Sequence, residues 1–431
     1  MSSSTPRSSW ANNPLALTYL RQALSHFQYL AQSNPRWRNE VSEALAEIGR
    51  IYRTQGNYLE ALAFLNQALT LIRLLPARNQ QADTLNSIGV LHLEQENYEP
   101  ATTAFHEALT LYRLVQDTHG TATILLNLAI IEQRQQHFLE AVTGFQEAES
   151  VARSVNNLDV VITALTGQGA IRTTQGQYTV AQATLEGALA EARTVNYRYR
   201  EAEILWRLAQ NFYATGDFPH TIALATQARD LAQQIQYAKL LSLANTTLGQ
   251  GYLGLADTVQ AKAAFLASVR TIEELRQNLS AGPAGAQLFL AERTAPYQAL
   301  ALLALAEHDD WAALNWTERA KARTLFDLVS QAERLADSGT KPVSPSRRIP
   351  WPTLDSSNTQ LLLRQTPRIV YLSYLATPQE TYLFVLTGDA STFLFDTDAQ
   401  CRAWTGRRWF AGSLGSNEYV APGGFDGAFG L

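Results

Sequence analysis

The sequence predicts an all-α fold, a solenoid in which antiparallel helix hairpins stack side by side. A small residue recurs in steps of 40 residues, at positions 49, 89, 129, 169, 209 and 249. Apolar residues around each of these positions repeat with the spacing of one helix face, and a turn signal separates two such faces in each unit. A fixed period of about 20–50 residues is typical of a stacked array and not of a single globular core.

The first unit shows how each hairpin arises. One set of small and apolar residues has the spacing i, i+3, i+4 and i+7, which places it on one face of a helix. Gly56 and Asn57 then interrupt the pattern and predict a turn. A second set defines the apolar face of a second helix. The first set is Leu45, Ile48, Gly49 and Tyr52, and the second is Tyr58, Ala61, Leu65 and Ala68.

Five further units repeat this pattern in phase. Gly or Ala at the recurring small position lets two helix backbones approach closely, and an aromatic residue at the start of the second helix fills the space between neighbouring hairpins. Each hairpin exposes apolar surface until the next one covers it, so stability is a sum over neighbours. The aromatic position is occupied by Tyr58, Tyr98, Phe138, Tyr178 and Phe218 in the first five units.

These in-phase units resemble the tetratricopeptide repeat (TPR) family, in a variety with longer helices and a period near 40 residues. The resemblance covers about Val41 to Arg276 and implies a right-handed superhelical solenoid of antiparallel hairpins. We predict six regular units over about 42–276 and an irregular closing unit over 281–335. Residues 14–335 would then form one solenoid, preceded by a disordered leader over residues 1–13.

The period changes after the solenoid. Ser, Pro and Gly predict a linker over 336–357, and short β-type runs follow at 368–375, 381–387 and 391–395. Together with the preceding Trp316–Leu325 segment, this order resembles the entry into a CHAT domain, a caspase-like α/β domain found behind TPR arrays. The resemblance covers about 311–395. We therefore expect residues 358–431 to form an incomplete CHAT-like segment, with a Gly-rich, unstructured tail from residue 411.

The resemblance to the CHAT family implies a Cys nucleophile and a His base, but no residue here inherits either role. All seven histidines precede the linker, and the single cysteine, Cys401, has a Gln-Cys-Arg context that does not match the family's nucleophile motif. We expect no catalytic, metal-binding or cofactor-binding residue in this chain, and hence no enzyme activity. The short C-terminus predicts a truncated domain, whether biological or an artefact of gene calling.

Composition excludes several other classes. The net charge is −5 without a long basic run, so nucleic acid is not an expected partner. No apolar run approaches the roughly 20 residues that span a bilayer. One cysteine allows no internal disulfide, and the Ser-rich N-terminus lacks the features of a secretory signal. We expect a cytoplasmic protein with no membrane association and leave its oligomeric state open.

The first helices of the hairpins are expected to line a concave groove that binds a protein or peptide segment. Arg and aromatic side chains there are suited to be binding hot spots. Register places twelve residues on this face: Glu43, Arg50, Arg53, Asn86, Val90, Glu94, Gln133, Arg134, Trp206, Gln210, Tyr213 and Gln250.

The sequence thus favours a non-enzymatic protein–protein interaction module with a regulatory or scaffolding role. The alternative is the N-terminal fragment of a TPR-CHAT caspase-like cysteine peptidase whose catalytic half is missing. A third possibility is a scaffold that oligomerises through an exposed β-edge, because unpaired edges attract other strands.

Overall fold

The computed structural model describes residues 14–277, 293–320 and five short segments, 371–376, 381–386, 392–395, 400–405 and 408–413. The chain divides into two compact units, Met1–Gly285 and Ala286–Leu431. Within the described residues, no helix combines the length and the apolar composition that crossing a bilayer requires.

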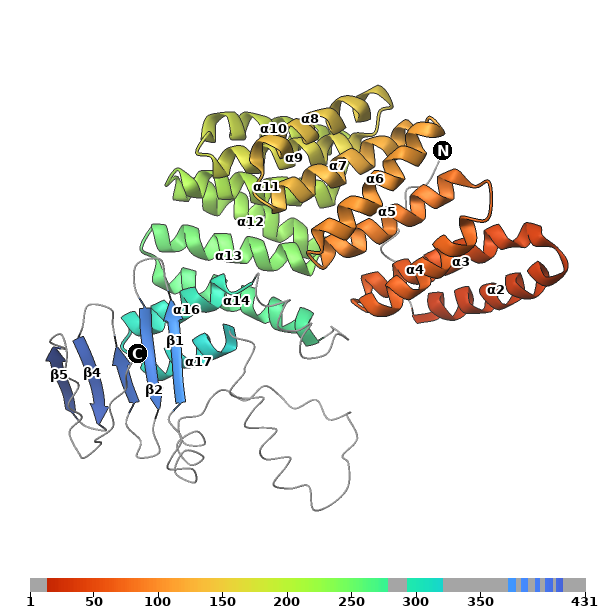
Figure 1. Cartoon of the computed structure of the whole chain (residues 1–431). Coiled ribbons are helices and arrows are strands. Elements are labelled where there is room, and N and C mark those ends of the chain that lie inside the picture. The colour runs from red at the N-terminus through yellow and green to blue at the C-terminus, as the bar shows by residue number, and fades with distance from the viewer. Residues whose placement is uncertain are drawn as a thin grey trace, which may run out of the picture. The chain divides into compact units, whose positions relative to one another are not determined.

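The first unit is helical throughout its described part, residues 14–277 (Figure 1). Helix α2 (Pro14–Ser33) and a single 3-10 turn (Pro35–Trp37) precede six hairpins. The hairpins are α3 (Arg38–Thr54) with α4 (Tyr58–Ile72), α5 (Arg78–Glu94) with α6 (Tyr98–Leu114), α7 (Thr118–Arg134) with α8 (Phe138–Ser154), α9 (Leu158–Thr174) with α10 (Tyr178–Thr194), α11 (Arg198–Ala214) with α12 (Phe218–Gln234), and α13 (Ala238–Gly254) with α14 (Thr258–Gln277).

The 40-residue register predicted from the sequence is confirmed. The first helices begin at residues 38, 78, 118, 158, 198 and 238, and the second helices begin 20 residues later in each unit. The recurring small residue is buried near the end of every first helix. The first unit is therefore an all-α helical repeat solenoid, as the periodicity predicted.

A left-handed residue ends most of the helices. Gly56 (φ 76°) follows α3, and the N–H of Asn57 donates to the carbonyl of Tyr52, five residues earlier, at 2.9 Å. This arrangement satisfies carbonyls that the helix end leaves without an intrahelical partner. Glu96 takes the same place after α5 with φ 59°, so the turn forms without glycine and keeps the same geometry in each unit.

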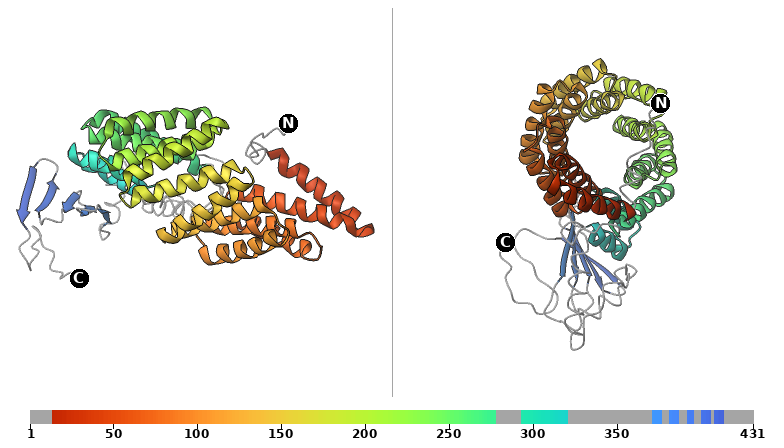
Figure 2. Two further views of the ribbon diagram at one scale, coloured as in Figure 1. Left: turned by 90° about the horizontal axis from the view of Figure 1, so that it is seen from above. Right: turned by 90° about the vertical axis from the view of Figure 1, so that its right-hand side faces the viewer.

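The stack is curved, with the first helices on its inner side. In the right-hand view of Figure 2, the hairpins of this unit follow a curved path. Each first helix, from α3 to α13, contacts the first helix of the next hairpin, whereas each second helix lies chiefly against the first helices before and after it. The curvature brings α5 and α13 near one another. This proximity is seen in the charge of Lys239 on α13, which acts on the Glu94 carboxyl of α5.

The recurring small residue is needed because a large side chain of the same hairpin packs onto it. A Cβ at Gly89 would lie 2.5 Å from the Phe105 ring, and a Cβ at Gly49 would lie 2.8 Å from Cγ of Leu65. Phe105 and Leu65 are fully buried. The small residue therefore makes the room that the core side chain of the second helix occupies.

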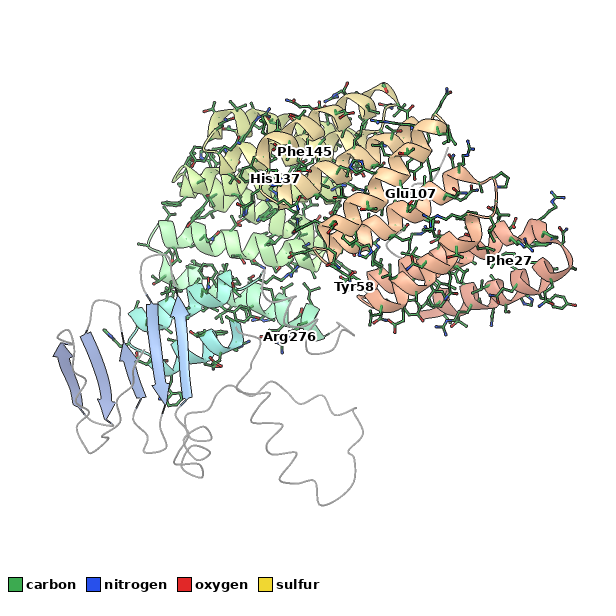
Figure 3. The ribbon with its side chains drawn as sticks, viewed as in Figure 1. Phe27, Tyr58, Glu107, His137, Phe145 and Arg276 are labelled. Carbon is green, nitrogen blue, oxygen red and sulfur yellow. The ribbon has the colours of Figure 1, made fainter. Side chains whose placement is uncertain are left out.

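The third hairpin solves the same packing problem differently. It carries Ala129 at the small position, and the Phe145 ring there lies against Gly167 of the next hairpin, where a Cβ would be 2.5 Å from the ring. Gly144 in turn leaves room for Ala129, because a Cβ added at Gly144 would lie only 2.9 Å from the Cβ of Ala129. Phe145, labelled in Figure 3, is 1% exposed and so joins two hairpins.

Substituting Ala101 by Leu tests the packing of the second helices. Ala101 is fully buried on α6, so the larger side chain should overpack the hairpin and cost about 1–3 kcal/mol of unfolding free energy. Ala190 on α10 is exposed and provides the matched control, for which the same change should stay within about 0.5 kcal/mol. Chemical denaturation measures both, and equal effects would contradict the register.

The second unit combines two helices with five strands. Helices α16 (Ala295–Ala306) and α17 (Asp310–Ala320) form a hairpin, and strands β1 (Tyr371–Ala376), β2 (Thr381–Leu386), β3 (Thr392–Phe395), β4 (Gln400–Thr405) and β5 (Arg408–Ser413) form an antiparallel sheet in sequential order. Tyr371 pairs with Leu386 and Ala376 with Thr381 across the first two strands.

Two features of this unit differ from the predicted domain boundaries. The hairpin predicted to close the solenoid belongs to the second unit, because Ala301, Ala313 and Leu314 pack in one cluster with Leu375 of β1. Strand β5 includes residues 411–413, which the sequence analysis assigned to the tail, because pairing with β4 extends them. The predicted leader, the linker 336–357 and the tail beyond residue 413 lie outside the described residues.

Candidate peptide-binding face

The candidate site is the inner face of the first unit. We use this name for the sides of α3, α5, α7, α9, α11 and α13 that point away from the second helices. Equivalent positions recur on it every 40 residues, so one lengthwise row contains Arg50, Val90, Ile130, Ala170, Gln210 and Gln250. The predicted residues are therefore spread along five of these helices, α3, α5, α7, α11 and α13, instead of meeting in a single pocket.

Three of the predicted charged residues are engaged with protein partners. Arg50 donates from Nε to Oε2 of Glu47 at 3.1 Å and from Nη1 to the Ser87 hydroxyl at 3.4 Å. Arg53 forms an ion pair with Glu94 of the next hairpin. Burial raises the pKa of Glu94, although the charges of Arg53 and Lys239 oppose the change. These side chains join the hairpins and are less available to a ligand than the sequence suggested.

Asn86 is part of a polar contact that sequence reasoning did not include. Asn127 of α7 donates from Nδ2 to Oδ1 of Asn86 at 3.0 Å. Asn86 and Asn127 are 41 residues apart, one residue more than the repeat period. Trp206 and Thr247 are also 41 residues apart. This offset across adjacent first helices is a signal that could have identified both pairs.

Trp206 requires a correction, because it was predicted to contact a ligand. Its side chain is buried, with 7% of the residue exposed, and its Nε1 donates to the Thr247 hydroxyl at 3.0 Å. The guanidinium of Arg207 covers the ring, 4.3 Å from its centroid. Trp206 therefore joins α11 to α13 and offers little surface to a ligand.

Arg207 is a residue of this face that the sequence analysis missed. Its Nη1 donates to Oε1 of Gln210 at 3.2 Å, while its Nε is buried without an acceptor. Burial lowers the pKa of Arg207; Glu203 opposes the change, and the positive charge of Arg134 adds to it. The sequence contained a signal for this residue, because Arg207 lies three residues before Gln210 and therefore on the same face of the helix.

The remaining predicted residues keep accessible surface. Tyr213 is 40% exposed, and its ring lies tilted against Phe218 with centroids 6.1 Å apart. Glu43 and Arg134 are exposed, and three others are half-buried: Val90, Gln133 and Gln250. This mixture of an aromatic ring, amides and charges could contact both the backbone and the side chains of an extended ligand.

A separate pocket of about 350 Å³ lies between α10 and α12, over α11. None of the twelve predicted residues lines it. Its lining is apolar at Leu189, Leu208, Phe212 and Leu224 and polar at Gln182, Glu186, His220 and Gln227. The rings of Phe212 and His220 stack there, with centroids 5.1 Å apart.

The described part of the chain contains no cluster of metal-ligating side chains. No group of three or more His, Cys, Asp and Glu side chains in this part of the chain is arranged to hold a metal ion. Cys401 lies within β4, where it pairs with Phe395 of β3 and Gly412 of β5.

Comparison with known proteins agrees with this architecture. Residues 40–114 and 81–154 match the family model described as tetratricopeptide repeat. Aspartyl phosphate phosphatase F from Bacillus subtilis has a similar structure, with 15% identity, a TM-score of 0.52, and coverage of 74% of this chain and 77% of that one. A Rap protein complexed with competence and sporulation factor has 16% identity, a TM-score of 0.50, and coverage of 75% and 89%.

A comparison with curated proteins found no match. At these identities the structural similarities show the fold alone. The class that the fold defines is the all-α helical repeat solenoid. More particularly, the repeats within residues 40–154 match the tetratricopeptide repeat model.

Proposed function

We propose that this protein is a protein–protein interaction module whose inner face binds an extended peptide segment of a partner. The observation that carries the proposal is the row of accessible, chemically mixed side chains along this face, which includes Tyr213, Gln250 and Val90. The inner face provides a long surface that runs along successive first helices, and such a surface suits a ligand that is itself extended. The Rap protein with similar architecture is complexed with competence and sporulation factor, which adds support by analogy of fold.

Photo-crosslinking can place a ligand on this face. Peptides that bind the full chain would first be selected from a displayed random library. A benzophenone side chain would then replace Val90 or Tyr213 on the inner face, or Thr103, which is exposed on the second helix α6. We expect crosslinks at the two inner-face positions and not at Thr103.

The same selected peptides test the energetic role of Tyr213. Truncation to Ala should weaken their binding by at least about tenfold, which is the scale of an aromatic hot spot. Crosslinks confined to Thr103, together with unchanged affinity of the Tyr213→Ala variant, would contradict the proposal.

As a second proposal, residues from about 311 to 395 correspond to the start of a CHAT-like domain. The supporting observation is that α17 is followed in sequence by antiparallel strands at 371–376, 381–386 and 392–395. We assign no catalysis to this segment, since Cys401 lies inside a strand and not after one. An experimental structure of the full chain tests this proposal, and helical repeats over 371–395 would exclude it.

A further inference from the structure

Arg207 differs from Arg50, Arg53 and Arg200 in having no carboxylate within ion-pair distance. Arg200, on the same helix, donates from Nε to Oδ1 of Asp159 at 2.9 Å and from Nη1 to Oε2 of Glu203 at 3.1 Å. Arg50 and Arg53 also form ion pairs, with Glu47 and Glu94. Among the described residues, no Asp or Glu lies within ion-pair distance of Arg207; its Nη1 donates to Gln210, its guanidinium covers the Trp206 ring, and Glu203 acts on it through its charge without an ion pair.

The repeat itself explains why Arg207 has no partner on the neighbouring helices. The equivalent position on α9 is Gly167, which has no side chain because the Phe145 ring occupies the place of its Cβ. The equivalent position on α13 is Thr247, whose hydroxyl accepts from Trp206. Neither of these equivalent positions therefore carries a carboxylate.

This arrangement is unfavourable in the free protein. A buried N–H without an acceptor has lost its hydrogen bond to water without replacement, and a charged group loses more than a neutral one. The positive charge of Arg134 adds repulsion, which contributes to the lowered pKa of Arg207. An anion bound at this point would satisfy the orphaned donor and offset the repulsion.

We propose that Arg207, together with Gln210, binds a carboxylate side chain of an acidic peptide segment on the inner face. This inference rests on the proposed function and specifies the chemistry of its ligand. The planar guanidinium can donate two parallel hydrogen bonds to a carboxylate. The Trp206 ring beneath it, itself held by Thr247, keeps the plane oriented without consuming its edge donors.

Fluorescence anisotropy with two fluorescein-labelled probes tests the proposal on the full chain. Hexaglutamate supplies carboxylates, and hexaglutamine has the same length without the charges. We expect hexaglutamate to bind more tightly, and Arg207→Gln to weaken its binding by about ten- to a hundredfold, as expected for hydrogen bonds to a charged group. Arg113→Gln is the matched control, because Arg113 is exposed on α6, pairs with Glu147 at 3.6 Å, and lies outside the inner face.

Arg207→Lys separates charge from geometry. Lys keeps the positive charge but cannot form two parallel hydrogen bonds. The affinity of the Arg207→Lys variant for hexaglutamate should therefore lie between those of the original chain and the Arg207→Gln variant. Thermal melting of the free variants serves as the folding control. Arg207→Gln should melt no lower than the original chain, because it removes a partly buried cation whose Nε has no acceptor.

Equal binding of the two probes, or unchanged hexaglutamate affinity in Arg207→Gln, would overturn the inference. If library-selected peptides still crosslink at Val90 in that case, the proposed function stands and only the acidic ligand is rejected. If neither hexaglutamate nor any selected peptide reaches the inner face, both proposals fail together.

Discussion

Phe105→Ala should lower the unfolding free energy by about 3–5 kcal/mol, which is among the largest effects expected for a single substitution. The Phe105 side chain is fully buried and lies directly against Gly89 of its own hairpin. Removing the ring takes apolar surface out of the core and leaves a cavity that the flanking helices fill only in part. Chemical denaturation followed by circular dichroism measures the loss.

The control for this substitution is an apolar residue at the surface. Leu139 at the start of α8 is 76% exposed, so Leu139→Ala should change stability by no more than about 0.5 kcal/mol. Similar losses for the two variants would show that Phe105 is not a core residue of its hairpin.

A double variant checks the partnership between Phe105 and Gly89. Gly89→Ala alone should destabilise, because its Cβ would stand 2.5 Å from the Phe105 ring. Gly89→Ala with Phe105→Ala reproduces the Ala209 and Ala225 pair that the fifth hairpin buries completely. Because the two residues are in contact, the double variant should lose less than the sum of the single variants. If the stability losses of the two single variants simply added up in the double variant, Gly89 and Phe105 would not be in direct contact.

Trp206→Ala is the second substitution with a large expected effect, again about 3–5 kcal/mol of unfolding free energy. The indole is buried between α11 and α13, and its loss also removes the hydrogen bond to Thr247. Trp206→Phe keeps most of the packing, so it should lose about 1 kcal/mol, the typical net value of one hydrogen bond. Thermal and chemical denaturation distinguish the two variants.

The outcome for Trp206 decides between a structural and a binding role. If Trp206→Ala left stability unchanged but abolished the binding of selected peptides, the original prediction of a ligand-contacting tryptophan would be restored. A large loss of stability in the absence of any ligand is expected instead, because the ring already has its partners in the free protein.

The fold of the first unit was predictable because the information for it is local. The face spacing around Gly49, the turn at Gly56 and the 40-residue repetition each depend on residues close together in the chain. Stacking then follows from the need of every hairpin to cover its apolar face. Strands β4 and β5 were not predicted, because their short segments acquire extended form through pairing with one another and with β3.

The candidate site was predictable only in its location. Register correctly placed residues such as Gln210 and Tyr213 on the first helices, yet it could not tell an accessible side chain from one already in use. Trp206 and Thr247, or Arg53 and Glu94, meet because a neighbouring helix brings together residues about 40 apart, and that distance depends on how closely the backbones pack.

The sequence by itself determined the repeat and its period, because these follow from the spacing of small and apolar residues along each helix; which helices face inward was an expectation from the resemblance to tetratricopeptide repeats. Only the tertiary structure decided which side chains on that face are consumed by contacts between hairpins and which remain without a partner. Phe145 illustrates the reason: with Ala129 at the small position, its ring packs against Gly167 of the next hairpin, and that contact depends on how closely α8 and α9 approach one another.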